Sequence, residues 1–311
     1  MTDEAYISRF DIQRCNLNTW DANLRDIREI YVGFEALGIP TVNASRIGAY
    51  RDAFQSFSDA HQEQRKLDLS LAIRILNTMV EFRQLQTILR AATASQNRDM
   101  WRERLRQLIS GAEFSTHESN TASPRDFQFE SYIGAVCELS GYSVRFDEPD
   151  IVVTDNFQVF GIAAKRPRNE RKLQANCKKA VRQIRNSGIS GLIAIDLSFA
   201  LQADQCINTI DLRGATLFVE EIANGFIRDN HTRLQDICRD KCVLGALIHV
   251  QMPVINFGHP DGPQLATAIR WTVAPFTESQ VEGFFWATEF SRRCDLGLFG
   301  PRPPEDNQVD I

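Results

Sequence analysis

The residues from Gly161 to Ser190 carry an unusual concentration of positive charge. Nine of them are Lys or Arg and one is Glu, a local charge of +8 in a chain whose 35 Lys and Arg and 40 Asp and Glu give -5 overall. Each phosphate that a cation neutralises releases counterions, so this basic segment is a candidate contact surface for a nucleic-acid backbone. A solvated helix face explains a charge run equally well when the run is considered alone. Because the whole chain is acidic, any nucleic-acid surface must be local.

A short acidic motif precedes the basic segment. Pro149-Asp150 is followed, thirteen residues after the Asp, by Ala163-Ala164-Lys165. The surrounding pattern predicts the two strands of a hairpin over 151–153 and 157–164, and alternation along a strand places position 163 and Lys165 on one face. A carboxylate at the start of one strand and another on its neighbour can share Mg²⁺, while a lysine beside them orients or deprotonates a water. The spacing therefore points to hydrolytic chemistry on a phosphate ester.

This arrangement resembles the PD-(D/E)XK nuclease superfamily over about residues 123–200. In that family a Glu on the first core helix, an Asp opening the second strand and an acid-x-Lys on the third strand surround one or two metal ions. Glu130, Asp150 and Lys165 match the helix Glu, the strand Asp and the Lys. Gln183 matches a Gln that often follows the motif in the exonuclease-related branch of the family.

The resemblance implies a fold and an activity. The expected fold is α/β, a restriction-endonuclease-like mixed sheet with flanking helices, preceded by an all-α N-terminal domain. The expected activity is endonucleolytic hydrolysis of nucleic acid, DNA in preference to RNA, with Mg²⁺ or Mn²⁺. Glu130, Asp150 and the backbone carbonyl of Ala164 are the metal ligands that it implies. A role in bacterial or phage defence is expected only from the company that such nucleases keep.

The chain departs from the family pattern at Ala163, where the family has Glu or Asp. Alanine supplies no ligand oxygen, so metal binding should be weakened. Three explanations remain open: an inactivated form of a working nuclease, a natural pseudonuclease that binds without cutting, or an enzyme in which Glu148 or Glu130 replaces the missing acid. We favour a nuclease that lacks its catalytic acid and is inactive or weakened. The main alternative is a non-catalytic nucleic-acid-binding or assembly subunit.

The basic segment offers six candidate contacts to the nucleic-acid backbone: Arg166, Arg168, Lys172, Lys178, Lys179 and Arg182. The segment from Glu170 to Arg185 is predicted to be an amphipathic helix. Spacings of 4, 3 and 4 place four of its polar residues on one flank of that helix: Lys172, Asn176, Lys179 and Gln183. This flank is the part of the helix expected to face the acidic motif.

The remaining patterns divide the chain into a helical region over 1–115, a nuclease-like region over 116–299 and a flexible tail over 300–311. In the first region the spacing predicts a helix over about 67–92, which we expect to pack within its own bundle, and the polar stretch 113–122 predicts a linker. A capped helix follows the linker and ends at Gly141, and a short strand is expected next, over 142–146. Later strands and helices are expected over 191–196, 211–225, 243–257, 266–275 and 279–293.

The composition of the chain limits where in the cell the protein is expected to be and what it is expected to bind. The N-terminal residues show no basic stretch followed by an apolar run, no eighteen apolar residues occur in succession, and the seven cysteines suit reduced core thiols. We therefore expect a cytoplasmic protein that does not bind membranes. The helical N-terminal region is a candidate surface for a homodimer or for a partner protein.

Overall fold

The structure is a computed structural model with a mixed α/β fold, as the sequence predicted in its coarse form. It describes residues 12–18, 20–40, 45–63, 65, 69–109, 124–155, 158–198, 200, 206–258, 260, 264–274, 289–294 and 297. One eight-stranded sheet has the order β1-β8-β7-β5-β4-β3-β2, and β6 pairs with the far end of β7. The order of the core elements is helix, three strands, helix, strand, which is the order expected from the sequence.

The strands are β1 (Ile12–Asn18), β2 (Ser143–Arg145), β3 (Ile151–Asp155), β4 (Gln158–Lys165), β5 (Gly191–Asp196), β6 (Ile207–Thr209), β7 (Val243–Asn256) and β8 (Gln264–Ala274). The helices are α1 (Trp20–Ala36), α2 (Arg46–Gln62), α3 (Leu69–Ala94), α4 (Arg98–Leu108), α5 (Pro124–Leu139), α6 (Glu170–Ser187) and α7 (Leu212–Ile237). Strands β4, β5 and β7 run parallel to one another, whereas β2, β3 and β4 form an antiparallel meander.

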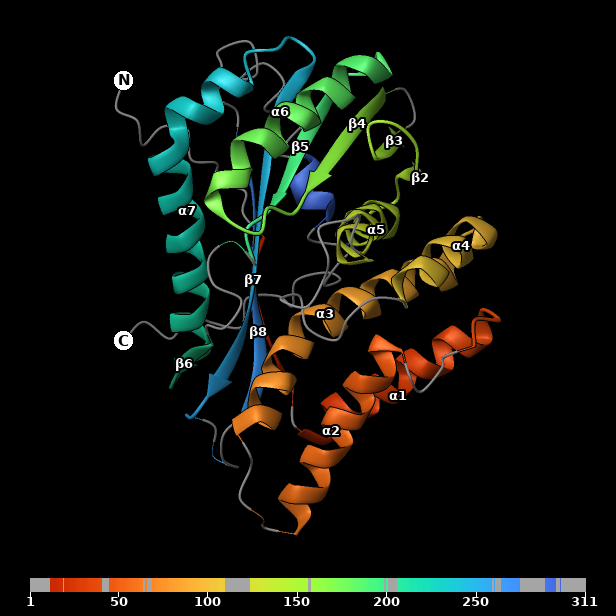
Figure 1. Ribbon diagram of the computed structural model, residues 1–311, viewed down its shortest axis with the longest axis vertical. Helices are drawn as coiled ribbons and strands as arrows, with labels where there is room; N and C mark the ends of the chain where they lie inside the picture. The colour runs from red at the N-terminus through yellow and green to blue at the C-terminus, as the bar shows by residue number, and fades with distance from the viewer. Residues whose placement is uncertain are drawn as a thin grey trace.

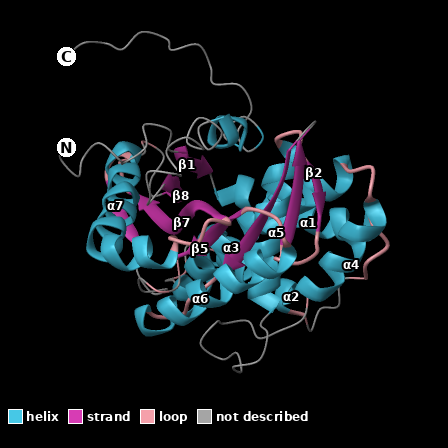
Figure 2. Ribbon diagram, turned by 90° about the horizontal axis from the view of Figure 1, so that it is seen from above, coloured by secondary structure: helices cyan, strands magenta, loops and turns pink. Residues whose placement is uncertain are grey.

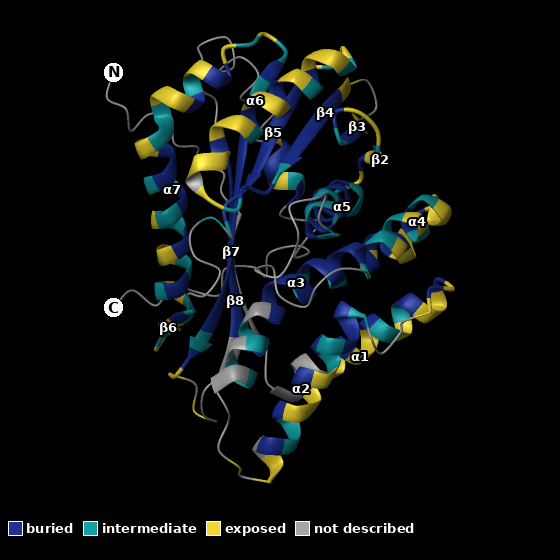
Figure 3. Cartoon of the chain, in the orientation of Figure 1, coloured by how far each residue is buried: buried dark blue, intermediate teal, exposed yellow. Residues whose placement is uncertain are grey.

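Helices cover both faces of the sheet. Helices α6 and α7 lie on one face, and α3 and α5 lie on the other, with α1, α2 and α4 packed outside them (Figures 1 and 2). Two apolar clusters fill the spaces on either side of the sheet. Strand β5 is buried along its whole length, as its unbroken apolar sequence predicted, and the outer side of α6 is exposed (Figure 3).

The expected all-α character of residues 1–115 is wrong at one element. Residues Ile12–Asn18 form β1, which pairs antiparallel with β8 at the edge of the sheet. The short segment has no clear strand pattern of its own, so its conformation is set by the partner strand that it meets in the fold. The predicted linker 113–122, the tail and most of the predicted helix 279–293 lie outside the described residues, although 289–294 are helical.

Helix α3 is the central helix of the N-terminal region. The helix predicted over about 67–92 packs inside the chain, on α1, α2, α5 and β7. The buried surface of α3 also includes two polar residues, Glu81 and Gln84, which are 3% and 0% exposed. A helix that buries charged and amide groups needs partners for them, since an unpaired buried polar group is costly.

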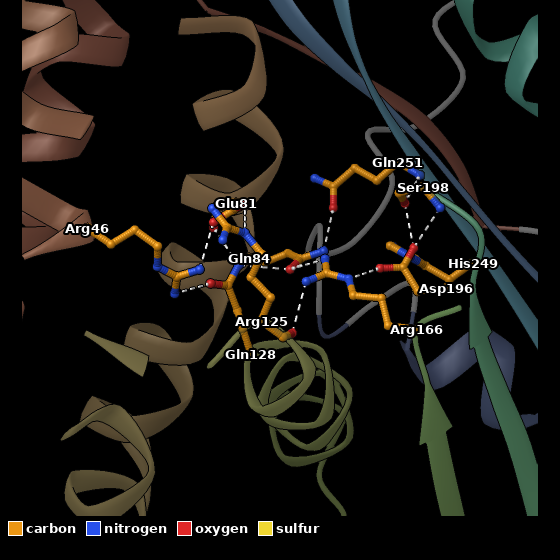
Figure 4. A network of polar contacts seen from close by, with 10 residues as sticks. All are labelled: Arg46, Glu81, Gln84, Arg125, Gln128, Arg166, Asp196, Ser198, His249 and Gln251. Carbon is orange, nitrogen blue, oxygen red and sulfur yellow. Dashed lines mark hydrogen bonds and ion pairs between the residues drawn. The ribbon is translucent and has the colours of Figure 1, made fainter. Parts of the chain in front are cut away.

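A buried polar network supplies those partners (Figure 4). Glu81 accepts hydrogen bonds from Arg46 of α2 and Arg125 of α5, and Tyr50 donates a further one. Burial alone would raise the pKa of Glu81, but Arg125 and Arg46 outweigh it and hold that pKa below its ordinary value. The carboxylate is therefore charged and neutralises guanidinium groups from two other helices.

The same network continues to the sheet through Arg166, which follows β4. Its guanidinium donates to Asp196 at 2.7 Å, to the Arg125 carbonyl at 2.9 Å and to Gln84 Oε1 at 3.3 Å. Asp196 ends β5 and also contacts His249 Nδ1 of β7 at 3.0 Å. One continuous set of hydrogen bonds thus joins α2, α3 and α5 to three strands.

Replacing the buried acid of this network should destabilise the fold strongly. Glu81→Gln leaves Arg46 and Arg125 buried with less compensating charge, so we expect urea unfolding to show a loss of about 3–5 kcal/mol at pH 7. Folding lowers the pKa of Glu81. The stability that its carboxylate contributes is therefore fully present above the unfolded pKa of 4.5, and it is lost as pH falls from 4.5 through the lower pKa of the folded state. The exposed pair Glu63–Arg65 provides the control: Glu63→Gln should change the free energy of unfolding by less than about 0.5 kcal/mol. Equal effects of the two substitutions would contradict this account of the network.

Candidate functional site

The predicted site residues line one cavity of about 370 Å³ at the meeting point of α5, β3, β4 and α6. We call it the site cavity. Its lining includes ten of the residues singled out from the sequence: Glu130, Asp150, Ala164, Lys165, Arg166, Arg168, Lys172, Asn176, Lys179 and Gln183. Asp126, Phe127 and Phe129 complete it. Residues more than fifty positions apart in the chain thus converge as the acidic motif and the helix spacing predicted.

Asp150 is the centre of the hydrogen bonding in this cavity. Its Oδ2 accepts from Lys165 Nζ at 2.6 Å and from the Ala164 amide at 2.9 Å. Its Oδ1 accepts from Gln183 Nε2 at 2.8 Å, and the same amide nitrogen contacts the Pro149 carbonyl at 2.7 Å. The Asp, Lys and Gln predicted from spacing therefore form one connected group.

Two glycines allow the acidic motif to approach the neighbouring strands. A Cβ atom on Gly161 would lie 2.6 Å from Cγ of Pro149, closer than real contacts allow. A Cβ on Gly191 of β5 would lie 2.4 Å from the Gly161 carbonyl oxygen. The small residues at these positions set the distance between β3, β4 and β5, and hence the place of Asp150.

Helix α6 is held in position by caps at both ends. At its start the Asn169 side chain accepts from the Lys172 amide, and at its end Gly188 adopts a left-handed conformation with φ of 69°. The buried face of α6 packs on the sheet with Leu173, Cys177 and Ile184. This orientation turns the flank with Lys172, Asn176, Lys179 and Gln183 toward the site cavity.

Ala163 lies opposite Asp150 but does not line the cavity. The pairing of Ile151 with Ile162 sets the register and places position 163 across from Asp150, on the same face of the sheet as Lys165. The methyl group is fully buried in the apolar cluster beneath α6, together with Leu173 and Cys177. The position at which the family resemblance led us to expect an acid is therefore filled by core packing.

The residues present do not fit a divalent metal ion as they stand. Asp150 already accepts three hydrogen bonds, and the Ala164 carbonyl accepts from Lys165 Nζ at 2.8 Å. Among the described residues, no group of three or more His, Cys, Asp or Glu side chains is placed to hold a metal. Glu148, considered as a replacement acid, is exposed and is not part of the cavity lining. Lys165 places its own positive charge between the two oxygens that a metal would use.

Glu130 reaches the cavity from α5 and has unusual electrostatics. Its carboxylate pairs with Arg104 of α4 at 3.2 Å. Burial, and then the negative charge of Asp150, raise the pKa of Glu130 to about 7, although Arg104 and Lys165 act in the opposite direction. A carboxyl group that titrates near neutral pH in a cavity is typical of functional sites, although ion-pair networks also produce such shifts.

The six candidate backbone contacts divide into three groups. Arg168, Lys172 and Lys179 line the site cavity. Lys178 and Arg182 lie on the other side of α6, in a groove shared with Asp229 and Asp236 of α7.

Arg166 requires a correction, because its side chain is 3% exposed and its guanidinium is committed to Asp196 and to backbone and amide oxygens. Although the residue borders the site cavity, it belongs to the buried network and does not present its charge to a ligand.

Sequence reasoning missed the supports of the site. Arg104 lies 26 residues before Glu130, and Gln84 lies 82 residues before Arg166. Neither belongs to a local motif, so spacing provides no signal for them. The acid at the end of the buried strand, Asp196, was the one available indication, since a charged group closing an apolar run must find a buried partner.

Comparisons with known proteins do not assign the chain to a family. No family model, no curated protein and no solved structure matches it. Within the part of the chain that the structure describes, none of the helices is both long and apolar enough to cross a membrane.

The raised pKa of Glu130 predicts a pH-dependent stability. The folded protein resists ionisation of this group, so its contribution to the free energy of unfolding should fall as pH rises from 4.5, the unfolded value, through about 7. The Gln variant has no such ionisation to resist. As pH rises from 5 to 8, the free energy of unfolding of Glu130→Gln, measured in urea, should therefore increase by about 1–3 kcal/mol relative to that of the unaltered chain. Carbon NMR should show the Glu130 carboxyl titrating near pH 7 and, in Asp150→Asn, at lower pH. A midpoint near 4.5 in the unaltered chain would contradict the prediction.

Proposed function

We propose that this chain binds the phosphodiester backbone of nucleic acid, DNA in preference to RNA, in the site cavity of a PD-(D/E)XK-type fold. The observation that carries the proposal is the convergence of Glu130, Asp150, Lys165 and Gln183 in one cavity bordered by a basic helix. The order of α5, three strands, α6 and a parallel strand supports the restriction-endonuclease-like assignment.

The charges of the site suit a phosphate group. Apart from Arg166, whose charge is paired with Asp196, four cationic side chains and three carboxylates border the cavity, and one of those carboxylates, Asp150, is neutralised by Lys165. The remaining excess of positive charge lies on the α6 side, where Lys172 and Lys179 are exposed. Phosphate contacts of this kind position a nucleic acid without reading its sequence.

Hydrolysis is the activity that the resemblance implies, with Mg²⁺ or Mn²⁺ held by Glu130, Asp150 and the Ala164 carbonyl. In this sequence we propose that cleavage is absent or weak, because Ala163 supplies no oxygen and Lys165 occupies the two oxygens beside it. A catalytic role for Lys165 and Gln183 belongs to a form of the chain that has the missing acid.

A non-catalytic nucleic-acid-binding or assembly subunit is the second candidate. The observation that favours it is the full burial of the Ala163 methyl group in the apolar cluster under α6. The core around this position is complete without a carboxylate. Both candidates share the same binding surface, and they differ in what restoration of the acid would produce.

Charge reversal on the cavity side of α6 should weaken nucleic-acid binding. We expect Lys172→Glu with Lys179→Glu to lower affinity for a labelled DNA duplex at least about tenfold and to flatten the dependence of log K on salt, because two phosphate contacts are lost. The matched control is Lys178→Glu with Arg182→Glu, which changes the same charge on the side of α6 that faces α7. If the control pair has the larger effect, the phosphate path runs through the α6–α7 groove and not through the site cavity.

Restoring an acid at position 163 should create metal binding. In Ala163→Glu the new carboxylate is expected to reach the neighbourhood of Asp150, its cross-strand partner, so calorimetry should show stronger binding of Mn²⁺ than in the unaltered chain. Ala163→Gln is the control of equal size, and circular dichroism checks that both fold. Ala163→Asp, with a shorter side chain, provides a second test if burial of Glu disrupts the core.

Cleavage by the restored protein separates the two candidates. Plasmid, linear duplex, single-stranded DNA and RNA should be incubated with Ala163→Glu and Mn²⁺, and Lys165→Ala should abolish any cleavage. A restored protein that binds metal and cuts none of these supports the non-catalytic subunit. If the unaltered chain cuts equally fast, Ala163 is not the position of the missing acid.

A further inference from the structure

A second cavity of about 700 Å³ lies between α1, α3 and the β7–β8 part of the sheet. We call it the α1–α3 cavity. Its size is in the range that holds a small organic molecule. It is separate from the site cavity, with which it shares no lining residue.

The floor of this cavity presents two neutral polar groups from the sheet. Thr267 of β8 is 2% exposed, and its hydroxyl has no hydrogen-bond partner among the described residues. Gln251 of β7 is 4% exposed, and its Oε1 accepts from Gln84. Since Gln251 pairs with Ile269 and Pro253 with Thr267, the two polar side chains are diagonal neighbours on one face of the sheet. A buried hydroxyl without a partner is costly, and a ligand that bonds to it removes that cost.

The walls and the mouth restrict the ligand further. Ile30, Leu89 and Ile269 make the walls apolar. At the mouth Glu29 and Arg90 are both exposed and have opposite charges. Arg83 of α3 also lines the cavity, but its guanidinium is paired with Asp26 at 2.9 Å. With that charge compensated, the interior favours an uncharged molecule that combines an apolar ring with a hydrogen-bonding edge.

We propose that the α1–α3 cavity binds an uncharged heterocyclic molecule of about nucleoside size, whose polar edge contacts Thr267 and Gln251. The position of Gln251 gives the bound molecule a route to the site cavity. Gln84 Nε2 donates to Gln251 at 3.2 Å, and Gln84 Oε1 accepts from Arg166 at 3.3 Å. Arg166 follows Lys165 directly and borders the site cavity. A ligand that competes for the Gln251 amide changes the hydrogen bonding of Gln84, and occupancy of the two cavities is thereby coupled.

Thermal unfolding of the full chain with adenosine, guanosine, cytidine or uridine tests the site. At least one nucleoside should raise the melting temperature, because a ligand that binds only the folded state stabilises it. Thr267→Val keeps the side-chain shape and removes the hydroxyl, so affinity for that nucleoside should fall about tenfold while the ligand-free protein is as stable as before or more stable. Thr154→Val, an exposed strand position remote from the cavity lining, is the matched control. No shift with any nucleoside, or an equal shift in Thr267→Val, would overturn the proposal.

The coupling rests on the proposed function and is measured separately. DNA affinity of the unaltered chain should change at least threefold when the nucleoside is present, and Gln251→Met should reduce that change to none. Because the melting experiment contains no nucleic acid, its failure is distinct from a failure to bind DNA. Nucleoside binding with unchanged DNA affinity, in a protein that does bind DNA, overturns the coupling.

Discussion

The structure depends on the burial of one guanidinium group, that of Arg166. It lies where β4 leaves the sheet, one residue after Lys165, and removal of its charge from water must be compensated by nearby groups. Asp196 supplies the opposite charge from β5, while Gln84 and the Arg125 carbonyl supply neutral acceptors from α3 and α5. The end of β4 is therefore tied to β5 and to two helices. The candidate site is built on that end of the strand.

This constraint explains why the N-terminal helices share a core with the α/β region. Helix α3 presents Glu81 to Arg46 and Arg125, and three residues later it presents Gln84 to Arg166. The apolar cluster on this side of the sheet includes residues of α1 to α5 together with strand residues. The helices are consequently part of the scaffold of the site cavity. A substitution on the buried side of α3 is expected to alter the position of Lys165, because Gln84 holds Arg166, the next residue in the chain.

Local patterns were sufficient for the hairpin and for the two helices around it. Alternation and turn residues predicted β3 and β4, capping residues predicted α5, and the apolar stripe predicted α6, so Asp150, Lys165 and Gln183 were correctly brought together. The patterns did not predict β1, because an edge strand of seven residues depends on β8 for its conformation. They also gave Arg166 an exposed role. Its burial depends on Asp196, 30 residues later, and on Gln84, 82 residues earlier, and no local rule contains such distances.

The same distinction applies to Ala163, whose significance changes between sequence and structure. The resemblance noted in the sequence led us to expect a metal ligand at this position, whereas in the structure the Ala163 methyl group is packed in the apolar cluster under α6. The two descriptions meet at Asp150, which faces position 163 across the hairpin and accepts hydrogen bonds from Lys165, Gln183 and the Ala164 amide. Charge balance around Asp150 is therefore achieved with a lysine in place of a cation from solution. A carboxylate introduced at 163 must draw Lys165 or a metal toward itself to be stable there, and this competition decides whether the site would hold a metal.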